Sequence, residues 1–345
     1  MAKRILSARI CSPLALHASE EAAWERLSST FHAMSSPFLS LHFARAVAQT
    51  GMDARVCVIY EDDQIRGFFP FQFPGRLAAW SGMAARMGGE MADYFGLIAE
   101  PGFHIKPAEL LSLAKINYLN FSHLEEIQLA HGLTGEQPRT GLRIKLDGAA
   151  AGSLQGLDSA KVKYLKDTQR RERQLVREVG PVKFAFDVQD GREQALQEMI
   201  TMKRAQYRRT NVQDALADPW KRSLLHRLSH FRYASCRGVL SVLSAGDQWM
   251  ATHFGILGNG VLQFWLPVYN PDLAKYAPGR LLLHRVIEAS SEWGFHTIDR
   301  GEGDTPSKRD LANDEHLFYR GAWHNRSASS QLVRGILSIK WRFGI

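Results

Sequence analysis

The sequence predicts an α/β (α+β) protein with two tandem domains, each built on a mixed, mostly antiparallel sheet flanked by helices. Two observations lead to this fold class. The 345 residues exceed the length over which one hydrophobic core usually extends, so two domains of roughly 150 residues each are expected. Three strand-like segments joined by short turns then precede a helix and a further strand, at 239–243, 249–257, 261–269, 280–293 and 297–299. This order predicts an antiparallel meander and a helical crossover to a strand beside the last one.

Local patterns predict the elements of the N-terminal half. Apolar residues at helical spacing predict helices over 20–34, with Ser19 as the N-cap, and over 39–50, which Gly51 ends. Two β-rich runs on either side of an acidic turn predict a hairpin over 55–73. This half is expected to close with a helix and a strand, over 107–117 and 126–129.

A segment of small residues at 148–156 marks the predicted divide, so the domains are expected at 1–150 and 151–345. A strongly basic helix follows over 161–177, with seven basic residues against two acidic ones. Further elements are expected at 182–186 (strand), 192–207 and 221–229 (helices). The hairpin pattern also recurs in the second half, which fits an internal duplication, although one such match can arise by chance.

Composition restricts the class of protein. With 45% hydrophobic and 23% charged residues the chain is expected to fold as a globular protein. It contains no secretory signal pattern and no apolar run of about eighteen residues that would span a membrane. Its three cysteines are scattered without partner spacing, which argues against a disulfide framework and a zinc site. A cytoplasmic location and the absence of a metal are therefore expected.

The formal charge of +8 favours anionic ligands such as nucleic acid, an anionic membrane surface or a nucleotide-like cofactor, although basic side chains that only maintain solubility would give the same excess. No Gly-x-Ser-x-Gly elbow or His-Glu-x-x-His spacing is present. The sequence thus gives no support to serine hydrolysis or metal catalysis.

The segment from Val268 to Leu283 is the most informative, because Pro278 and Gly279 join a strand end to a helix start. Unpaired N–H groups and a partial positive charge at a helix N-terminus suit a diphosphate, and a glycine allows close approach. Lys275 and Arg280 flank this point. An ordinary helix start after a loop has the same signature, so both interpretations stay open here.

In this region the sequence resembles the FemAB-like branch of the GNAT superfamily, often called CelD-like acetyltransferases. The resemblance covers most of residues 160–320 and the N-terminal half only loosely. The phosphate loop is shorter than is usual for GNAT proteins, which leaves the acyl donor open. The resemblance depends on the basic run from Arg170 to Gly180, Met250–Ile256, Trp265–Tyr269, Tyr276–Leu283, Ile298–Gly303 and Lys308.

The resemblance implies an acyl-CoA-dependent acyltransferase, with acetyl-CoA as a donor, that transfers the acyl group directly to an amine or hydroxyl in polysaccharide or cell-envelope biosynthesis. It implies tandem GNAT-like domains, with a degenerate N-terminal domain on the acceptor side. The residues expected to bind the cofactor are Trp265, Pro267, Val268, Tyr269, Lys275, Tyr276, Pro278, Gly279, Arg280 and Leu281.

Three residues are candidates for the chemistry of direct transfer, which needs a base, an orienting group and an acid. His253 is the candidate base, since its ordinary pKa is near neutral. Asp299, at a strand end, is the candidate to orient that histidine or the acceptor, and Tyr319 is the candidate to protonate the thiolate. Structural roles stay open for all three: a packed strand histidine, an aspartate that caps the next turn and a packed tyrosine. The expected substrate-binding residues are Asp93, Tyr94, Arg170, Arg300 and Lys308.

Two other functions remain open. A FemX-like transferase would use aminoacyl-tRNA, and the arginine-rich helix suits an RNA backbone, but no long helical arm is evident. A non-catalytic binding module on a decayed GNAT fold would fit the short phosphate loop. The expected acceptor is a small molecule or glycan rather than DNA, and the sequence fixes neither its identity nor the oligomeric state.

Overall fold

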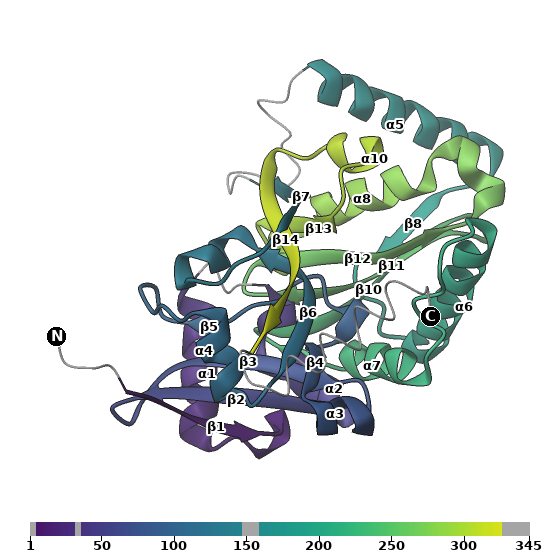
Figure 1. Cartoon of the computed structure of the whole chain (residues 1–345). Coiled ribbons are helices and arrows are strands. Elements are labelled where there is room, and N and C mark those ends of the chain that lie inside the picture. Colours follow the sequence, from purple (N-terminus) through teal and green to yellow (C-terminus); the bar gives the residue numbers. More distant parts are fainter. Residues whose placement is uncertain (1–4, 32–35, 147–158, 326–345) are drawn as a thin grey trace. The chain divides into compact units, whose positions relative to one another are not determined.

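The chain forms two compact units in the computed structural model, which describes residues 5–31, 36–146 and 159–325 (Figure 1). Unit 1 comprises residues 1–140 together with 316–345, and unit 2 comprises residues 141–315. The divide predicted at 148–156 lies outside the described residues. The boundary predicted at residue 150 assigns the last strand to the second domain, whereas the structure assigns that strand from His316 onward to unit 1.

Unit 1 is a mixed sheet with helices packed on it. Its strands lie in the order β1-β2-β3-β4-β6-β14, and β5 pairs with β3. The neighbouring pairs are antiparallel except β4 with β6, which is parallel. Its elements are β1 (Leu6–Cys11), α1 (Ala18–Thr30), α2 (Leu41–Gln49), β2 (Asp53–Glu61), β3 (Gln64–Phe73), α3 (Arg76–Ser81), β4 (Met83–Arg86), β5 (Ile98–Ala99), α4 (Pro107–Leu113), β6 (Tyr118–Glu125) and most of β14 (Asp314–His324).

Several elements of unit 1 confirm or correct the sequence-based expectations. The β2–β3 hairpin is confirmed, and its turn holds Asp62 and Asp63 at positive φ. Helix α1 starts after His17 rather than Ser19, because the backbone N–H of His17 donates to Glu20 Oε2 at 2.7 Å. The strand expected at 126–129 is wrong: residues Glu126–His131 form a 3₁₀ helix, and strand β6 ends just before it.

In unit 2 the strands lie in the order β7-β13-β12-β11-β10-β8, with β9 beside β10. The predicted basic helix, the meander and the crossover helix are all present. Its elements are the end of β7 (Gln137–Lys145), α5 (Ser159–Glu178), β8 (Val182–Ala185), α6 (Arg192–Arg209), α7 (Pro219–Ser229), β9 (Arg232–Tyr233), β10 (Cys236–Ala245), β11 (Gln248–Gly258), β12 (Val261–Tyr269), α8 (Pro278–Glu288), α9 (Ser290–Trp293), β13 (Thr297–Glu302), α10 (Pro306–Arg309) and the start of β14.

The two units repeat one order of elements. A strand, two helices and three antiparallel strands occur in unit 1 as β1–α1–α2–β2–β3–β4 and in unit 2 as β8–α6–α7–β10–β11–β12, with the short α3 inserted in the first series and the short β9 in the second. A single shared hairpin could arise by chance, but a shared series of six elements is far more specific. The tandem organisation expected from the sequence is therefore present in the fold.

Strands β12 and β13 separate partway along their length, and this positions the site. Their parallel pairing covers Val261 to Gln263 against Thr297 to Asp299. From Phe264 onward β12 stays paired with β11, and in the described part of the chain no strand pairs with its other edge. The last six residues of β12 therefore have one edge without a neighbouring strand.

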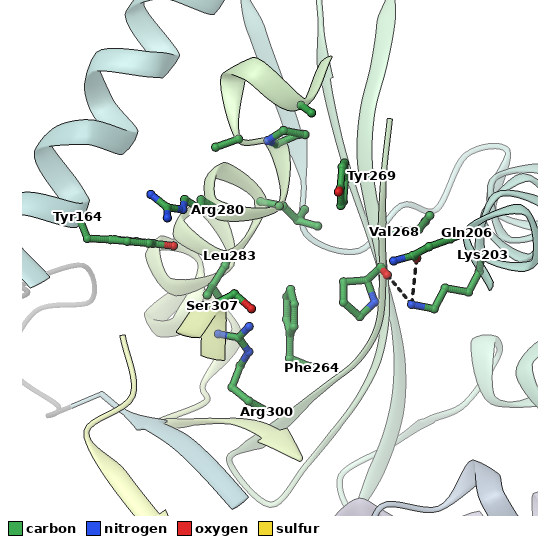
Figure 2. Close-up of a pocket in the computed structure, with 16 residues that line it drawn as sticks. Tyr164, Lys203, Gln206, Phe264, Val268, Tyr269, Arg280, Leu283, Arg300 and Ser307 are labelled. Carbon is green, nitrogen blue, oxygen red and sulfur yellow. Dashed lines mark hydrogen bonds between the residues drawn. The ribbon is translucent and has the colours of Figure 1, made fainter. Parts of the chain in front are cut away.

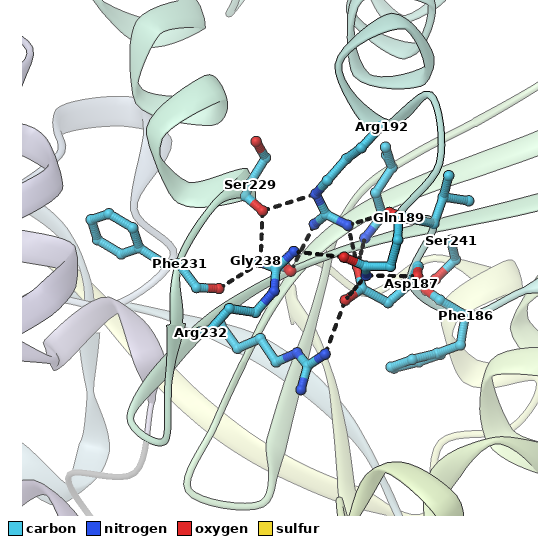
Figure 3. A network of polar contacts seen from close by, with 12 residues as sticks. Phe186, Asp187, Gln189, Arg192, Ser229, Phe231, Arg232, Gly238 and Ser241 are labelled. Atoms are coloured by element: carbon cyan, nitrogen blue, oxygen red, sulfur yellow. Dashed lines mark hydrogen bonds and ion pairs between the residues drawn. The ribbon is translucent and has the colours of Figure 1, made fainter.

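A buried ion pair fixes the helices of unit 2 to the sheet (Figure 3). The guanidinium of Arg192, at the start of α6, donates to Asp187 Oδ1 at 2.5 Å, to Ser229 O at 2.9 Å and to Gly238 O at 2.9 Å. These partners come from the β8–α6 loop, the end of α7 and β10. A Cβ on Gly238 would lie 2.1 Å from Leu228 O, so only glycine allows α7 to approach β10 this closely.

Candidate functional site

A cleft in unit 2 lies along the unpaired edge of β12 and the start of α8 (Figure 2). Its cavity volume is about 380 Å³, which falls within the range of small-molecule sites. The lining residues come from the strand, the helix start and five other parts of the unit: Tyr164, Lys203, Gln206, Phe264, Pro267, Val268, Tyr269, Ala274, Ala277, Pro278, Gly279, Arg280, Leu282, Leu283, Arg300 and Ser307.

The start of α8 leaves open space at Gly279. A Cβ at this position would meet no atom within 4 Å. Pro278 has no N–H, and the amides of Arg280 and Leu281 both donate to Ala277 O, at 3.0 and 3.2 Å. Of the exposed amides expected from the sequence, Gly279 N–H is thus the one that remains for a ligand at this helix start.

The charge of the cleft is positive. Lys203, Arg280 and Arg300 line it, and none of its sixteen described lining residues is acidic. The Arg280 guanidinium lies 4.6 Å from the centre of the Tyr164 ring, and its nitrogens are 3.6 Å from Asp167 and 3.7 Å from Asp310. These loose ion pairs leave the guanidinium able to contact a further anion. The cleft therefore suits an anionic ligand.

Helix α5 is attached to the segment before α8 by several polar contacts. Arg171 donates to Lys275 O at 2.5 Å, and Tyr276 Oη donates to Glu178 Oε2 at 2.6 Å. These contacts hold Tyr164, which is on the same helix, at the cleft. Burial raises the pKa of Tyr164 to about 12, so its hydroxyl stays protonated at neutral pH.

Lys203 reaches the cleft from α6. Its Nζ donates to Pro267 O at 2.8 Å and to Gln206 Oε1 at 3.2 Å (Figure 2). Burial lowers the pKa of Lys203 to about 8. In mildly alkaline solution a large fraction of the protein molecules therefore has Lys203 in its neutral form.

Phe264 separates the predicted base from the cleft. Its ring stacks on His253 with centroids 4.1 Å apart, and Arg300 lies 5.4 Å from its centre on a neighbouring strand. His253 is fully buried, does not line the cleft, and has its Nδ1 3.5 Å from Ser241 Oγ. Burial lowers the pKa of His253 to about 3. These are the properties of a packed side chain, so the base role expected for His253 gains no support from its position.

The other two predicted catalytic residues also occupy structural positions. Asp299 is buried and accepts hydrogen bonds from Gly301 N at 2.7 Å and from Arg143 Nε at 3.2 Å, which corresponds to the turn-capping alternative. Tyr319 lies in β14 of unit 1, opposite Leu124 of β6. The segment around Tyr319 is a strand.

The predicted cofactor residues fall into two groups. Six of them line the cleft: Pro267, Val268, Tyr269, Pro278, Gly279 and Arg280. The other four lie next to it: Trp265 faces Phe254 with ring centroids 6.1 Å apart, Lys275 is paired with Glu178 at 2.9 Å, Tyr276 is buried, and Leu281 is in the core.

The predicted substrate residues are divided between the units. Arg300 lines the cleft, whereas Lys308 donates to Glu302 O at 2.7 Å beside it. Arg170 is exposed and paired with Asp167 at 2.7 Å.

Asp93 and Tyr94 belong to unit 1. Tyr94 is buried there, with its Oη 3.4 Å from His316 Nε2, and Asp93 Oδ1 lies 3.9 Å from His123 Nε2. His123 is one of the few residues other than glycine at positive φ, 61°. Unit 1 therefore has its own polar cluster around this pair.

Sequence reasoning missed Lys203 and Tyr164. A signal was present for Lys203, since it continues the buried stripe formed by Leu196, Met199 and Ile200 on α6. A lysine on the apolar face of a helix needs a partner or a function. Tyr164 likewise lies on the buried side of α5, as Leu175 does, whereas Val162 on the same helix is exposed.

Comparison with known proteins identifies the fold. A family model described as an acetyltransferase (GNAT) domain matches residues 163–309. The fold is a tandem GNAT fold. FemX aligns with a TM-score of 0.55 and 10% identity over 94% of this chain and 99% of that one. L-PGS from Bacillus licheniformis aligns at 0.52 and 12% over 94% and 96%, and a tandem GNAT protein from the clavulanic acid biosynthesis pathway at 0.51 and 11% over 92% and 98%. No curated protein matches the sequence.

The GNAT domain model matches residues 163–309 and the solved structures show the fold, while the FemAB-like or CelD-like branch stays a prediction. Within the described ranges, no helix is long and apolar enough to cross a bilayer. Nor does any group of three or more His, Cys, Asp or Glu side chains there have the arrangement needed for a metal ion.

Proposed function

We propose that this protein is an acyl-CoA-dependent N- or O-acyltransferase that binds its donor in the cleft of unit 2. The observation that carries the proposal is the unpaired edge of β12 beside the unobstructed start of α8. Acyl-CoA carries a diphosphate, which an open helix start can bind, and two amides, which can pair with a free strand edge. The GNAT domain match over the same residues supports a transferase.

The residues present fit such a donor. Gly279 N–H and the Arg280 side chain would hold the diphosphate, and the edge of β12 up to Tyr269 would pair with the pantetheine amides. The lack of acidic groups among the described lining residues avoids repulsion of the phosphates. When bound, the donor supplies an activated acyl group.

The reaction proposed is direct transfer. The acceptor nitrogen or oxygen forms a bond to the thioester carbonyl carbon, the carbon–sulfur bond breaks, and the thiolate takes a proton. Tyr164, whose side chain lines the cleft, is the acid in this proposal, in place of Tyr319, which belongs to unit 1. No covalent intermediate on the enzyme is required.

The acceptor is proposed to be a small molecule or glycan, as in the FemAB-like and CelD-like branch, in polysaccharide or cell-envelope biosynthesis. The cluster around Asp93 and Tyr94 is the proposed acceptor side of unit 1. The partly exposed carboxylate of Asp93 suits hydrogen bonds from a sugar or an amine.

Calorimetric titration with acetyl-CoA tests the proposal first, followed by thiol release from a panel of acyl-CoA donors with amino-sugar acceptors. Saturable binding and acceptor-dependent thiol release are expected. Salt-dependent binding of aminoacyl-tRNA without acetyl-CoA binding would instead favour the FemX-like function. Absence of heat and of thermal stabilisation with either donor would favour a non-catalytic module.

A further inference from the structure

Lys203 is a buried lysine whose hydrogen-bond acceptors are uncharged. The side chain is 8% exposed, on the buried stripe of α6. In the described part of the chain no carboxylate contacts its Nζ, whose hydrogen-bond acceptors are Pro267 O and Gln206 Oε1. A buried ammonium group normally has an ionic partner, so this environment favours the neutral amine.

Burial, rather than a nearby charge, lowers the pKa of Lys203, and two groups face it from neighbouring elements. His253 of β11 is uncharged at neutral pH, since burial lowers its pKa to about 3. Arg300 of β13 lines the same cleft and carries a positive charge. The ring of Tyr207, on the same helix and 5.3 Å from Nζ, acts in the opposite direction, because its face attracts a cation.

The hydrogen-bond count of a neutral lysine matches its two partners. A neutral amine has two N–H groups and one lone pair. Pro267 O and Gln206 Oε1 accept both hydrogens, which leaves the lone pair for another proton. Figure 2 shows the amine beside β12 at Pro267, across the strand from Phe264 and Arg300.

We propose that Lys203 is the catalytic base that takes the proton from the attacking nitrogen or oxygen of the acceptor. This inference rests on the proposed function. As the new carbon–nitrogen or carbon–oxygen bond forms, the acceptor proton moves to Lys203 Nζ. The carbon–sulfur bond breaks, its electron pair stays on sulfur, and Tyr164 protonates the thiolate. Exchange with water then returns the proton of Lys203 to Tyr164, so that both groups regain their starting states.

A structural role for the same lysine makes a different prediction. If Lys203 only connects α6 to β12 through Pro267 O, then any long donor should replace it. Lys203→Arg separates the two roles, because a guanidinium can donate to both acceptors but cannot lose its proton. A base role predicts that this variant is inactive, whereas a structural role predicts that it is active.

The test uses the full-length protein and its Lys203→Arg, Lys203→Met and Lys221→Met variants. Lys221 is the matched control, because its side chain is equally buried but lies on α7, paired with Asp218 at 3.0 Å and away from the cleft. Acetyl-CoA binding is measured by calorimetry, and thiol release is measured from pH 6 to 10 with glucosamine or, without added amine, with water as acceptor. Thermal unfolding verifies that each variant is folded.

The expected result is a loss of at least 100-fold in kcat for both Lys203 variants, which is typical for removal of a general base. The Kd for acetyl-CoA should stay within threefold of the wild-type value, and Lys221→Met should resemble the wild type. With water as acceptor, which has no titrating amine of its own, the rate of the wild type should rise with pH through an apparent pKa near 8, and this rise should disappear in the Lys203 variants.

Two outcomes would overturn the inference, and they are distinguishable. If the wild type does not bind acetyl-CoA, the proposed function is wrong and the role of Lys203 falls with it. If the wild type binds and turns over acetyl-CoA but Lys203→Arg keeps most of the activity, or the rise near pH 8 persists in it, only the base role is wrong.

Discussion

Replacement of Gly279 by glutamate should weaken donor binding while leaving the fold intact. A side chain at this position enters open space at the start of α8, since a Cβ there would have no atom within 4 Å. The residue has no positive φ that would make a substitution costly. The new carboxylate would therefore occupy the space that the proposal assigns to the diphosphate.

The size of the effect follows from the charges involved. Two unit charges about 4 Å apart interact with roughly 4 kcal/mol at the effective dielectric constant near a protein surface. Arg280 beside this point is partly exposed, with 40% of its side chain accessible, so water and salt reduce the repulsion. A loss of about 1.5–3 kcal/mol remains, which is roughly 10- to 150-fold in Kd for acetyl-CoA.

Calorimetry with acetyl-CoA at two salt concentrations measures this effect. Gly279→Ala is the companion variant, expected to bind nearly as the wild type does and to be more stable by about 0.5 kcal/mol, because alanine reduces the entropy of the unfolded chain. Gly75→Glu is the matched control, since Gly75 also lies at a helix start, as the N-cap of α3 in unit 1, and has equally open surroundings. A folded Gly279→Glu variant with wild-type affinity would refute the placement of the diphosphate.

Three further predictions concern stability. Trp323→Ala should lower the free energy of unfolding by about 3–5 kcal/mol in chemical denaturation, because this buried indole packs against Phe121 with ring centroids 4.6 Å apart. Arg192→Met should cost a similar 3–5 kcal/mol, since it leaves Asp187 buried without its closest partner; hydrogen exchange should place the loss in unit 2. Burial lowers the pKa of His253 from 6.5 to about 3, so between these values the unfolded chain binds a proton and the folded chain does not. Stability should therefore fall as pH drops from 6.5 to 3, by on the order of 4 kcal/mol, and urea titrations of His253→Gln should show a weaker fall.

The sequence predicts best those elements whose stability depends on local patterns. The basic helix expected at 161–177 is α5 at Ser159–Glu178, and the meander before α8 has its predicted strands and turns. Periodicity, turn residues and Pro278 at the helix start are all local signals. They need no knowledge of the residues packed against them.

Strand β14 could not be recognised in this way. Its residues from Phe318 onward pair with β6, about two hundred positions earlier in the chain, and nothing local to Tyr319 indicates this partner. The order of strands likewise depends on long-range pairing. Secondary structure that is stabilised by distant residues therefore cannot be predicted from short segments.

The candidate site was predicted where it follows the chain and missed where it is assembled from distant elements. Pro267 to Arg280 form a continuous path from β12 to α8, and six of the ten predicted cofactor residues line the cleft. Lys203 and Tyr164 enter from other helices. The helical spacing of Lys203 from Met199 and Ile200 predicts that it is buried, but its contact with Pro267 O depends on the packing of α6 against β12.

The return of the last strand to unit 1 affects how the protein is made. Residues 1–140 leave the ribosome first, but their sheet lacks β14 until all of unit 2 has been synthesised. During translation the edge of β6, with Phe121 and Leu124, has no strand beside it and is open to wrong pairing. We therefore expect a chaperone to protect this edge of β6 in the nascent chain. A chain that stops before residue 316 would keep the edge without its neighbouring strand.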